Sequence, residues 1–272
     1  MVSVIIPTFN RSAQVLEAVS SVLGQERVPA QVIVVDDGST DDTADALGVF
    51  GSRIRLIRQP RKGVSGARNR GVLEAQHPWL AFLDSDDLWL PGKLSTQLDY
   101  LSMHPEIRIC QTEEIWLRNG RRLNPKKYHR KPQGHCFHLL LERCLVSPSA
   151  VMIHRSLFDQ VGGFDEHLVA CEDYDLWLRI GLRHPIGLVE KPLVVKRGGH
   201  PDQLSSCIPA LDRFRIRALL KILADGAMTG EQRHLALDAL SRKARVYLTG
   251  LNKRGNLEEA ATILAAIENL PP

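Results

Sequence analysis

The chain has 272 residues, of which 44% are hydrophobic and 24% charged, a composition that excludes disordered, collagen-like and coiled-coil proteins. Its 35 basic and 31 acidic side chains give a net charge of +4, a surplus so mild that we expect no nucleic-acid partner. No apolar run approaches the ~18 residues of a membrane-spanning helix, and no signal-peptide pattern opens the sequence. We therefore expect a soluble, unexported protein of the cytoplasm.

The cysteines are odd in number and show no C-x-x-C spacing. Such a set is typical of reduced thiols in a cytoplasmic protein, and it argues against a zinc site. The five are Cys110, Cys136, Cys144, Cys171 and Cys207.

Strand and helix signals alternate through the first hundred residues. Short, almost wholly apolar runs predict buried strands over residues 2–7, 31–36, 54–58 and 79–83. Ser12 can cap a first helix that ends at Gly24. An acidic turn at Asp41 and Asp42 begins a second helix, and a Gly-rich turn precedes a third near residues 65–75. This alternation is typical of right-handed βαβ units and predicts a parallel sheet.

The rest of the chain has a looser pattern that becomes helical toward its end. We expect a helix over residues 93–104, strands over 107–114 and 150–154, and an amphipathic helix over 173–183. Three further helices are predicted over residues 211–224, 231–248 and 257–269. The chain should therefore divide into an α/β domain over residues 1–205 and a C-terminal helical cap over 206–272.

Three polar clusters follow predicted strands, at residues 8–11, 36–37 and 84–87. Ligands of parallel sheets lie beyond the carboxyl ends of the strands, so the clusters should meet at one edge. Asp84 and Asp86 stand two residues apart on an extended chain and would point the same way. With Asp87 they would repel one another unless a cation is bound, and Mg²⁺ and Mn²⁺ prefer such oxygen ligands. The alternative is a polar loop in which an aspartate caps a helix.

Two motifs of the first half allow both a functional and a structural interpretation. Asp36 and Asp37 can accept hydrogen bonds from a base or a ribose, or can belong to the turn that Gly38 makes. Arg68 lies in a Gly-rich segment before a helix, where its guanidinium can donate to a base or a phosphate. Neither motif decides the matter alone.

The second half adds two candidates for chemistry and one charged run. Glu172 and Asp173 begin an apolar helical face, where carboxylates either cap the helix or supply a general base. His200, in a Gly-Gly-His turn, either lies at the surface or completes a metal shell. Residues 118–131 hold seven Lys or Arg residues and no carboxylate. This run is either a solvated loop or a patch for a phosphorylated, acidic or membrane-associated substrate.

Five segments carry a resemblance to a known family: Val4–Arg11, Val34–Ser39, Gly66–Asn69, Phe82–Asp87 and Glu172–Asp175. In this order and spacing the chain resembles family-2 glycosyltransferases over residues 2–205. The resemblance implies a GT-A fold, a Rossmann-like α/β fold with a mixed, mostly parallel sheet flanked by helices. It also implies a nucleotide-diphosphate-sugar donor, a divalent metal (Mn²⁺ or Mg²⁺) and inversion at the anomeric carbon. Residues 1–105 would form the nucleotide-binding half and 106–205 the acceptor-side half.

The resemblance also assigns catalytic and metal-binding roles to single residues. It implies that Asp173 is the catalytic base and that Glu172 supports it. Asp86 corresponds to the main metal ligand. His200 lies in a late motif that reaches the metal or the diphosphate in some members of the family.

Donor binding is the third role that the resemblance assigns. Asp37 would read the base, and with Arg68 it would offer an acceptor and a donor to one base edge, which favours a UDP-sugar. The residues expected to bind the donor nucleotide are Pro7, Thr8, Phe9, Asn10, Arg11, Asp36, Asp37, Arg68, Asp84 and Ser85.

The leading interpretation is a metal-dependent inverting glycosyltransferase that moves a sugar to a hydroxyl of a glycan, a lipid-linked or a protein acceptor. Nucleotidylyl transfer is less favoured, because it usually needs a Gly-rich basic loop where this chain has Pro7–Asn10. A non-catalytic nucleotide-sugar or glycan-binding module with a helical interaction tail is the other alternative. Asp84, Asp86 and Asp173 together argue against it, because binding alone needs no separate base. A lipid-linked acceptor would bring the protein to the inner face of the membrane as a peripheral partner.

Overall fold

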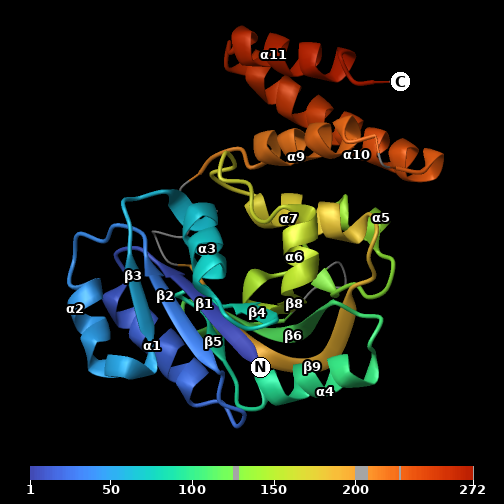
Figure 1. Ribbon diagram of the computed structural model, residues 1–272. Coiled ribbons are helices and arrows are strands. Elements are labelled where there is room, and N and C mark those ends of the chain that lie inside the picture. Colours follow the sequence, from blue (N-terminus) through green and yellow to red (C-terminus); the bar gives the residue numbers. More distant parts are fainter. Residues whose placement is uncertain (125–128, 200–207, 227, 272) are drawn as a thin grey trace.

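The computed structural model describes residues 1–124, 129–199, 208–226 and 228–271, and it places the strands in one mixed sheet (Figure 1). The strands are β1 (Val2–Thr8), β2 (Gln31–Asp36), β3 (Arg55–Arg58), β4 (Trp79–Phe82), β5 (Leu88–Trp89), β6 (Ile109–Arg118), β7 (Arg121–Leu123), β8 (Val151–His154) and β9 (Gly187–Gly198). Their order across the sheet is β3-β2-β1-β4-β8-β6-β9-β5, and β7 pairs with β6. The predicted α/β class is confirmed.

The sheet is parallel on one side and mixed on the other. β1 runs parallel to β2 and β4, and β2 runs parallel to β3, which is the βαβ part that the sequence predicted. β8 runs antiparallel to both of its neighbours, β4 and β6. β9 runs parallel to β6, and the sequence did not predict it. Three exposed residues, Glu190, Lys191 and Pro192, interrupt its apolar pattern, and the register with β6 shifts there.

Most of the described helices fall close to predicted ones, with differences at their first turns, whereas two short helices over residues 137–140 and 155–161 were not predicted. Ser12 is the first residue of its helix rather than the cap, a position that Arg11 takes without a side-chain hydrogen bond. The next helix begins only at Thr43, whose N–H donates to the Asp41 carboxylate (3.0 Å), so that Asp41 and Asp42 precede it. The helices are α1 (Ser12–Leu23), α2 (Thr43–Leu47), α3 (Gly63–Glu74), α4 (Lys93–Met103), α5 (Phe137–Leu140), α6 (Arg155–Val161), α7 (Glu172–Gly181), α9 (Asp212–Ala224), α10 (Gly230–Lys253) and α11 (Leu257–Glu268).

Helices cover both faces of the sheet (Figure 1). Val4 and Ile6 of β1 share a buried cluster with α1 and α4 on one face. Ile5, which lies between them, points to the other face and belongs to the cluster under α3, α6 and α7, as the period of two along a strand requires. α3 can approach β1 closely because residue 71 is a glycine. A Cβ atom at this position would lie only 2.4 Å from the Ile5 Cγ2 atom.

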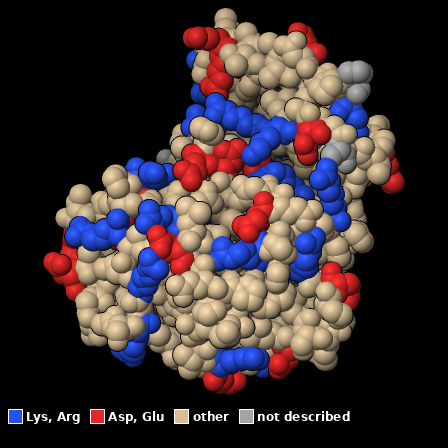
Figure 2. Space-filling model, in the orientation of Figure 1, with Lys and Arg blue, Asp and Glu red and all other residues tan. Residues whose placement is uncertain are grey.

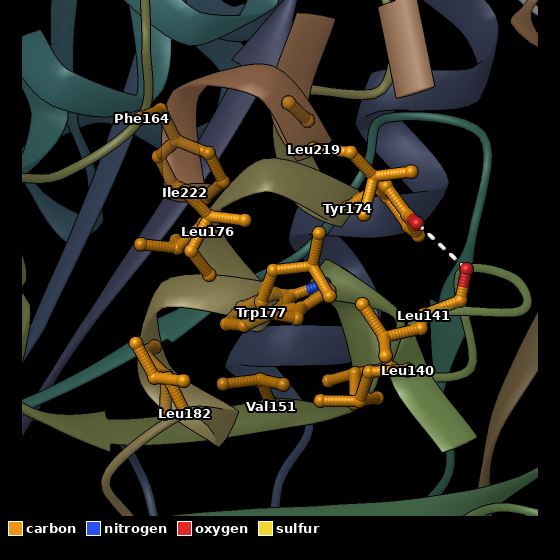
Figure 3. Close-up of a cluster of buried hydrophobic side chains, with 14 of the residues drawn as sticks. Leu140, Leu141, Val151, Phe164, Tyr174, Leu176, Trp177, Leu182, Leu219 and Ile222 are labelled. Atoms are coloured by element: carbon orange, nitrogen blue, oxygen red, sulfur yellow. Dashed lines mark hydrogen bonds between the residues drawn. The ribbon is translucent and has the colours of Figure 1, made fainter. Parts of the chain in front are cut away.

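The C-terminal helices continue the second of these clusters rather than forming a core of their own. Trp177 of α7, only 1% exposed, lies between Leu140 and Val151 on one side and Leu219 and Ile222 of α9 on the other (Figure 3). Residues of α10 complete the same cluster. The helix that begins with Glu172 and Asp173 is therefore packed from both directions.

Ion pairs also connect α9 and α10 to the α/β body. Lys221 of α9 contacts Asp165 (2.7 Å) and Asp175 (3.2 Å), and Arg242 of α10 pairs with Glu142. Figure 2 shows basic and acidic side chains interleaved along this boundary. Among the described residues, no helix combines the length and apolarity needed to cross a membrane.

Candidate active site

Hydrogen bonds connect the loop after β1 to the loop after β2. Asn10 takes a left-handed backbone conformation (φ 50°), which asparagine tolerates better than most residues. Its N–H donates to the Ser39 hydroxyl (2.9 Å), and its side-chain oxygen accepts from the Thr40 N–H (2.8 Å). The Arg11 N–H donates to the Thr43 hydroxyl (3.0 Å). Two of the three polar clusters thus lie together at the carboxyl edge of the sheet, as predicted.

The other residues expected to bind the nucleotide in this loop lie at the end of β1 or directly after it. Pro7 and Thr8 are buried, and the Thr8 hydroxyl has no hydrogen-bond partner within the described part of the chain. The Phe9 ring packs against the Arg61 guanidinium, 3.8 Å from the ring centroid. The loop therefore presents a buried, unpaired hydroxyl and a cation–aromatic pair.

Asp36 and Asp37 are engaged in the turns that follow β2. Asp36 accepts from the Ser39 N–H (2.9 Å). The Asp37 carboxylate accepts from the Gln59 side chain (2.7 Å) and from the N–H groups of Lys62 and Gly63 (2.8 Å each). These contacts match the turn interpretation of the motif, and base reading by Asp37 stays a prediction.

The carboxylates after β4 are paired with cations of the protein itself. Asp84 lies 3.6 Å from the Lys196 ammonium, which in turn contacts Asp87 at 2.8 Å. Asp86 pairs with Arg11 at 2.8 Å. The repulsion that suggested a bound cation is therefore already relieved by side chains of the chain.

Burial and charge act in opposite directions on these groups. Burial would raise the pKa of Asp84, but the charges of Arg68 and Lys196 outweigh it and lower the pKa to about 2. Burial raises the pKa of Asp87 to about 6, with Asp86 and Asp84 adding to the shift and Lys196 opposing it. The pKa of Lys196 is raised well above its ordinary value, because the two carboxylates outweigh its burial. Asp84 is thus ionised at neutral pH and held by fixed cations.

Arg68 joins the carboxylates of the sheet edge to those at the start of α7. Its guanidinium donates to Glu172 (2.6 Å) and to Asp84 (2.7 Å), and the whole residue is 3% exposed. Burial lowers the pKa of Arg68, but the charges of Asp84 and Glu172 more than compensate, so that the net shift is upward. The structure places Arg68 between these two acids, whereas the sequence predicted it beside Asp37 at a base edge.

Asp173 lies half-buried at the start of α7, and each of its carboxylate oxygens accepts a hydrogen bond. Its Oδ1 atom accepts from the Tyr174 N–H (2.7 Å), and its Oδ2 atom accepts from the Cys144 thiol (3.1 Å). The residue that caps the helix, Cys171, has a left-handed backbone (φ 59°), a strained conformation for a side chain other than glycine. Backbone strain of this kind is often found at functional sites.

The expected metal ligands are only partly described. Among the described residues, no three His, Cys, Asp or Glu side chains are gathered as a metal site, and His200 lies outside them. Asp86, 14% exposed at its side chain, offers one carboxylate. Mg²⁺ is commonly held by one or two carboxylates together with substrate phosphates, so this donor set fits a metal that arrives with a diphosphate.

The basic run at residues 118–131 is not a uniform patch. Lys126 and Lys127 lie outside the described residues. The Lys131 ammonium is buried and contacts Glu114 (3.1 Å) and Gln111 (3.2 Å) of β6. Lys131 therefore does not belong to a solvated loop or to a free cationic surface, whereas Arg130 is exposed.

Three residues that contact the carboxylates of the site were not predicted from the sequence. Lys196 sits on β9, and the paired valines before it were the only signal for a strand there. Ser149 donates from its hydroxyl to Asp87 (2.6 Å), and Cys144 donates to Asp173. Neither belongs to a periodic pattern or a motif, so only the folded chain reveals them.

Comparisons with known proteins point to one family. Residues 3–162 match the family model described as glycosyl transferase family 2. The chain is 32% identical over 194 residues to an uncharacterized glycosyltransferase of Rickettsia felis, covering 71% of this chain and 32% of that protein. The chain thus spans about a third of the length of that relative. It is also 32% identical to WfgD of Escherichia coli, named a UDP-Glc:α-D-GlcNAc-diphosphoundecaprenol β-1,3-glucosyltransferase, covering 66% of this chain and 69% of that protein.

Solved structures give the same picture of the fold. S. aureus TarS 1-349 in complex with UDP-GlcNAc superposes with a TM-score of 0.77 at 20% identity, covering 99% of this chain and 81% of that one. Mannosyltransferase PcManGT of Pyrobaculum calidifontis, in complex with GDP-Man and Mn²⁺, superposes with a TM-score of 0.65 at 20% identity, covering 97% and 78%. The predicted GT-A fold is confirmed. With the family model matching more than half of its residues, the chain belongs to glycosyltransferase family 2.

Proposed function

We propose that the chain transfers a sugar from a nucleotide-diphosphate donor to a hydroxyl of its acceptor, with inversion at the anomeric carbon. The observation that carries this proposal is the chain of contacts from Asp84 through Arg68 to Glu172, next to the half-buried Asp173. It ties the carboxyl edge of the sheet, where donors bind in such folds, to the start of α7, where Asp173 is the carboxylate that we propose takes the proton.

In the proposed step the acceptor oxygen attacks C1 of the sugar while the bond from C1 to the diphosphate breaks. The electron pair of that bond leaves with the diphosphate, and the acceptor proton passes to Asp173. Glu172 is less suited to this task because it is buried and bound to Arg68 at 2.6 Å. General-base assistance of this kind is typically worth about 10²–10⁴ in rate.

A divalent ion, Mn²⁺ or Mg²⁺, is part of the proposal. Asp86 would hold it together with phosphate oxygens of the donor, and the ion would stabilise the charge of the departing diphosphate. Arg11, which pairs with Asp86 at 2.8 Å, would then be released toward the same phosphates.

The donor and acceptor are proposed from the relatives. WfgD is named for a UDP-sugar donor and a lipid-linked diphosphate acceptor, and we propose the same classes for this chain. PcManGT binds GDP-Man, so the base requires a test of its own. Calorimetry with UDP and GDP, each with Mn²⁺, provides it, and equal or tighter binding of GDP would overturn the uridine preference. A lipid-linked acceptor would place the reaction at a membrane face.

The general-base role is tested by Asp173→Asn. The variant keeps the volume of the side chain and an amide oxygen that can accept from the Tyr174 N–H, but it cannot take a proton. We expect donor binding to stay at the parental level and sugar transfer to fall about 10²–10⁴-fold. The measurement is release of nucleoside diphosphate and formation of glycosylated acceptor. Near-parental transfer would remove Asp173 from the mechanism, and a parent that binds donor without ever releasing product would favour the non-catalytic binding module.

The metal role is tested by Asp86→Asn, with Asp45→Asn on the exposed face of α2 as a matched control. Loss of the Asp86 charge should weaken binding of UDP in the presence of Mn²⁺ and leave binding without Mn²⁺ nearly unchanged. Titration calorimetry with and without the metal separates the two effects. If Asp86→Asn responds to Mn²⁺ as the parent does, the metal is held elsewhere.

A further inference from the structure

The thiol of Cys144 contacts the carboxylate to which the acceptor proton is proposed to pass. Its sulfur lies 3.1 Å from Asp173 Oδ2 and 3.2 Å from the backbone oxygen of Val146. A thiol has one hydrogen and can donate to one of these at a time. The ionised carboxylate is the stronger acceptor, so the thiol donates to Asp173 while that group is charged.

We propose that Cys144 is a positioning residue for Asp173, whose thiol orients the carboxylate before the transfer and turns to Val146 once the carboxylate has taken the proton. The inference rests on the proposed function and deepens it at the same site. A thiol is a weaker donor than a hydroxyl, so it can hold the oxygen in place at a smaller cost in the basicity of Asp173. A hydroxyl in the same position would stabilise the charged form more strongly and make the base less effective.

The surroundings of the pair keep the thiol in its donating form. Burial raises the pKa of Cys144 well above its ordinary value, and the charge of Asp173 raises it further. Cys171 and Glu172 on the same helix start act in the same direction. Arg215 of α9 interacts electrostatically with the thiols of Cys144 and Cys171, which contribute to the raised pKa of the arginine. Glu172 itself forms an ion pair with Arg68, which partly neutralises its charge.

The first test compares the pH–kcat profiles of Cys144→Ser and Cys144→Ala with the parent. In Cys144→Ala the carboxylate loses a hydrogen bond to its charged form, so the acidic limb should move to higher pH and kcat should fall about tenfold. In Cys144→Ser the acidic limb should move to lower pH while most of kcat is retained. Donor affinity should be the same in all three proteins. An acidic limb that stays in place in both variants would overturn the proposal.

A matched control is Cys136→Ala, which removes another buried thiol from the same hydrophobic cluster. Its acidic limb should coincide with that of the parent. If Cys144→Ala does not fold, the serine variant alone still decides the direction of the shift.

The second test does not depend on sugar transfer. Alkylation of Cys144 by iodoacetamide, followed peptide by peptide with mass spectrometry from pH 7 to 10, reports how readily the thiol ionises. Asp173→Asn removes the neighbouring charge, so Cys144 should react at lower pH in this variant than in the parent. Identical alkylation profiles would show that the two groups do not interact and would overturn the inference. A parent that transfers no sugar would instead contradict the proposed function, with the alkylation result still readable.

Discussion

The guanidinium of Arg68 donates to two carboxylates, Asp84 and Glu172, whose pKa values nevertheless shift in opposite directions. Asp84 also has Lys196 beside it, and its pKa falls to about 2 despite burial. Glu172 has the charge of Asp173 beside it instead, and burial together with that charge raises the pKa of Glu172 to about 7 against the opposing effect of Arg68. Glu172 therefore exchanges its proton near neutral pH.

This asymmetry predicts a pH-dependent stability that Glu172→Gln removes. Between pH 4.5, the ordinary pKa, and about pH 7 the unfolded chain releases a proton that folded Glu172 retains. The contribution of Glu172 to the free energy of unfolding should therefore decrease as pH rises through this window, by up to about 1.4 kcal/mol per pH unit. Glutamine has no carboxyl proton to lose, so this decrease is absent from the variant. The free energy of unfolding of the variant should therefore rise relative to that of the parent by the same amount per pH unit. Urea unfolding of both proteins at pH 5, 6 and 7 measures the difference.

The control for this prediction is Glu190→Gln, an exposed position on β9. Its unfolding free energy should follow the parent at every pH. Parallel curves for Glu172→Gln and the parent would mean that Glu172 is already ionised throughout the window.

At this scale the sequence singled out three carboxylates of the candidate site but did not predict the groups that contact them. Asp84, Asp86 and Asp173 could be found because each follows a strand or begins a helix. The cation Lys196 and the thiol Cys144 come from segments without periodicity. Their approach depends on how β9 and the loop after α5 fold over the sheet edge, which no local pattern encodes.

Among the elements, β6 carries an ion pair that holds Lys131, the last residue of the basic run, against the sheet. The side chains of Lys131 and Glu114 are 5% and 3% exposed. Lys131→Ala would leave the Glu114 charge buried without its partner, and we expect a loss of about 3–5 kcal/mol in the free energy of unfolding. Arg130→Ala, next to it but exposed, should change that energy by no more than about 0.5 kcal/mol.

Chemical denaturation of both variants checks this prediction. The double variant Lys131→Met with Glu114→Leu removes both charges and should recover most of the stability. Equal stability of Lys131→Ala and Arg130→Ala would restore the solvated-loop interpretation for the whole run.

The longer helices were predicted more accurately than the strands, for a physical reason, whereas the short helices α5 and α6 were missed. The apolar period of α7, α9 and α10 survives along each helix, so their ends could be placed within a few residues. The 12-residue strand β9 was missed because Glu190 to Pro192 break its alternation at the register shift with β6. The domain boundary near residue 205 stays a prediction, since it falls at residues outside the described ranges.

At the scale of the whole molecule, the cluster on the α3, α6 and α7 face of the sheet reaches through α7 into α9. Leu219 of α9 is fully buried in that cluster, whereas Leu264 of α11 is 46% exposed. Leu219→Ala should lower the free energy of unfolding by about 2–5 kcal/mol, and Leu264→Ala by no more than about 0.5 kcal/mol. Because the cluster is continuous, Leu219→Ala should unfold in a single transition when followed by circular dichroism and by tryptophan fluorescence. Two separate transitions would mean that the helical extension folds on its own.

The packing of Trp177 between Leu140 and Leu219 also bears on how such chains can be recombined. A chimera that exchanged the segment after residue 208 between two relatives would exchange half of the surface on which α7 rests. The graft would then alter turnover, because the proposed base is carried at the first turn of that helix. Successful recombination would need α7 and α9 to be inherited together, as one unit of exchange.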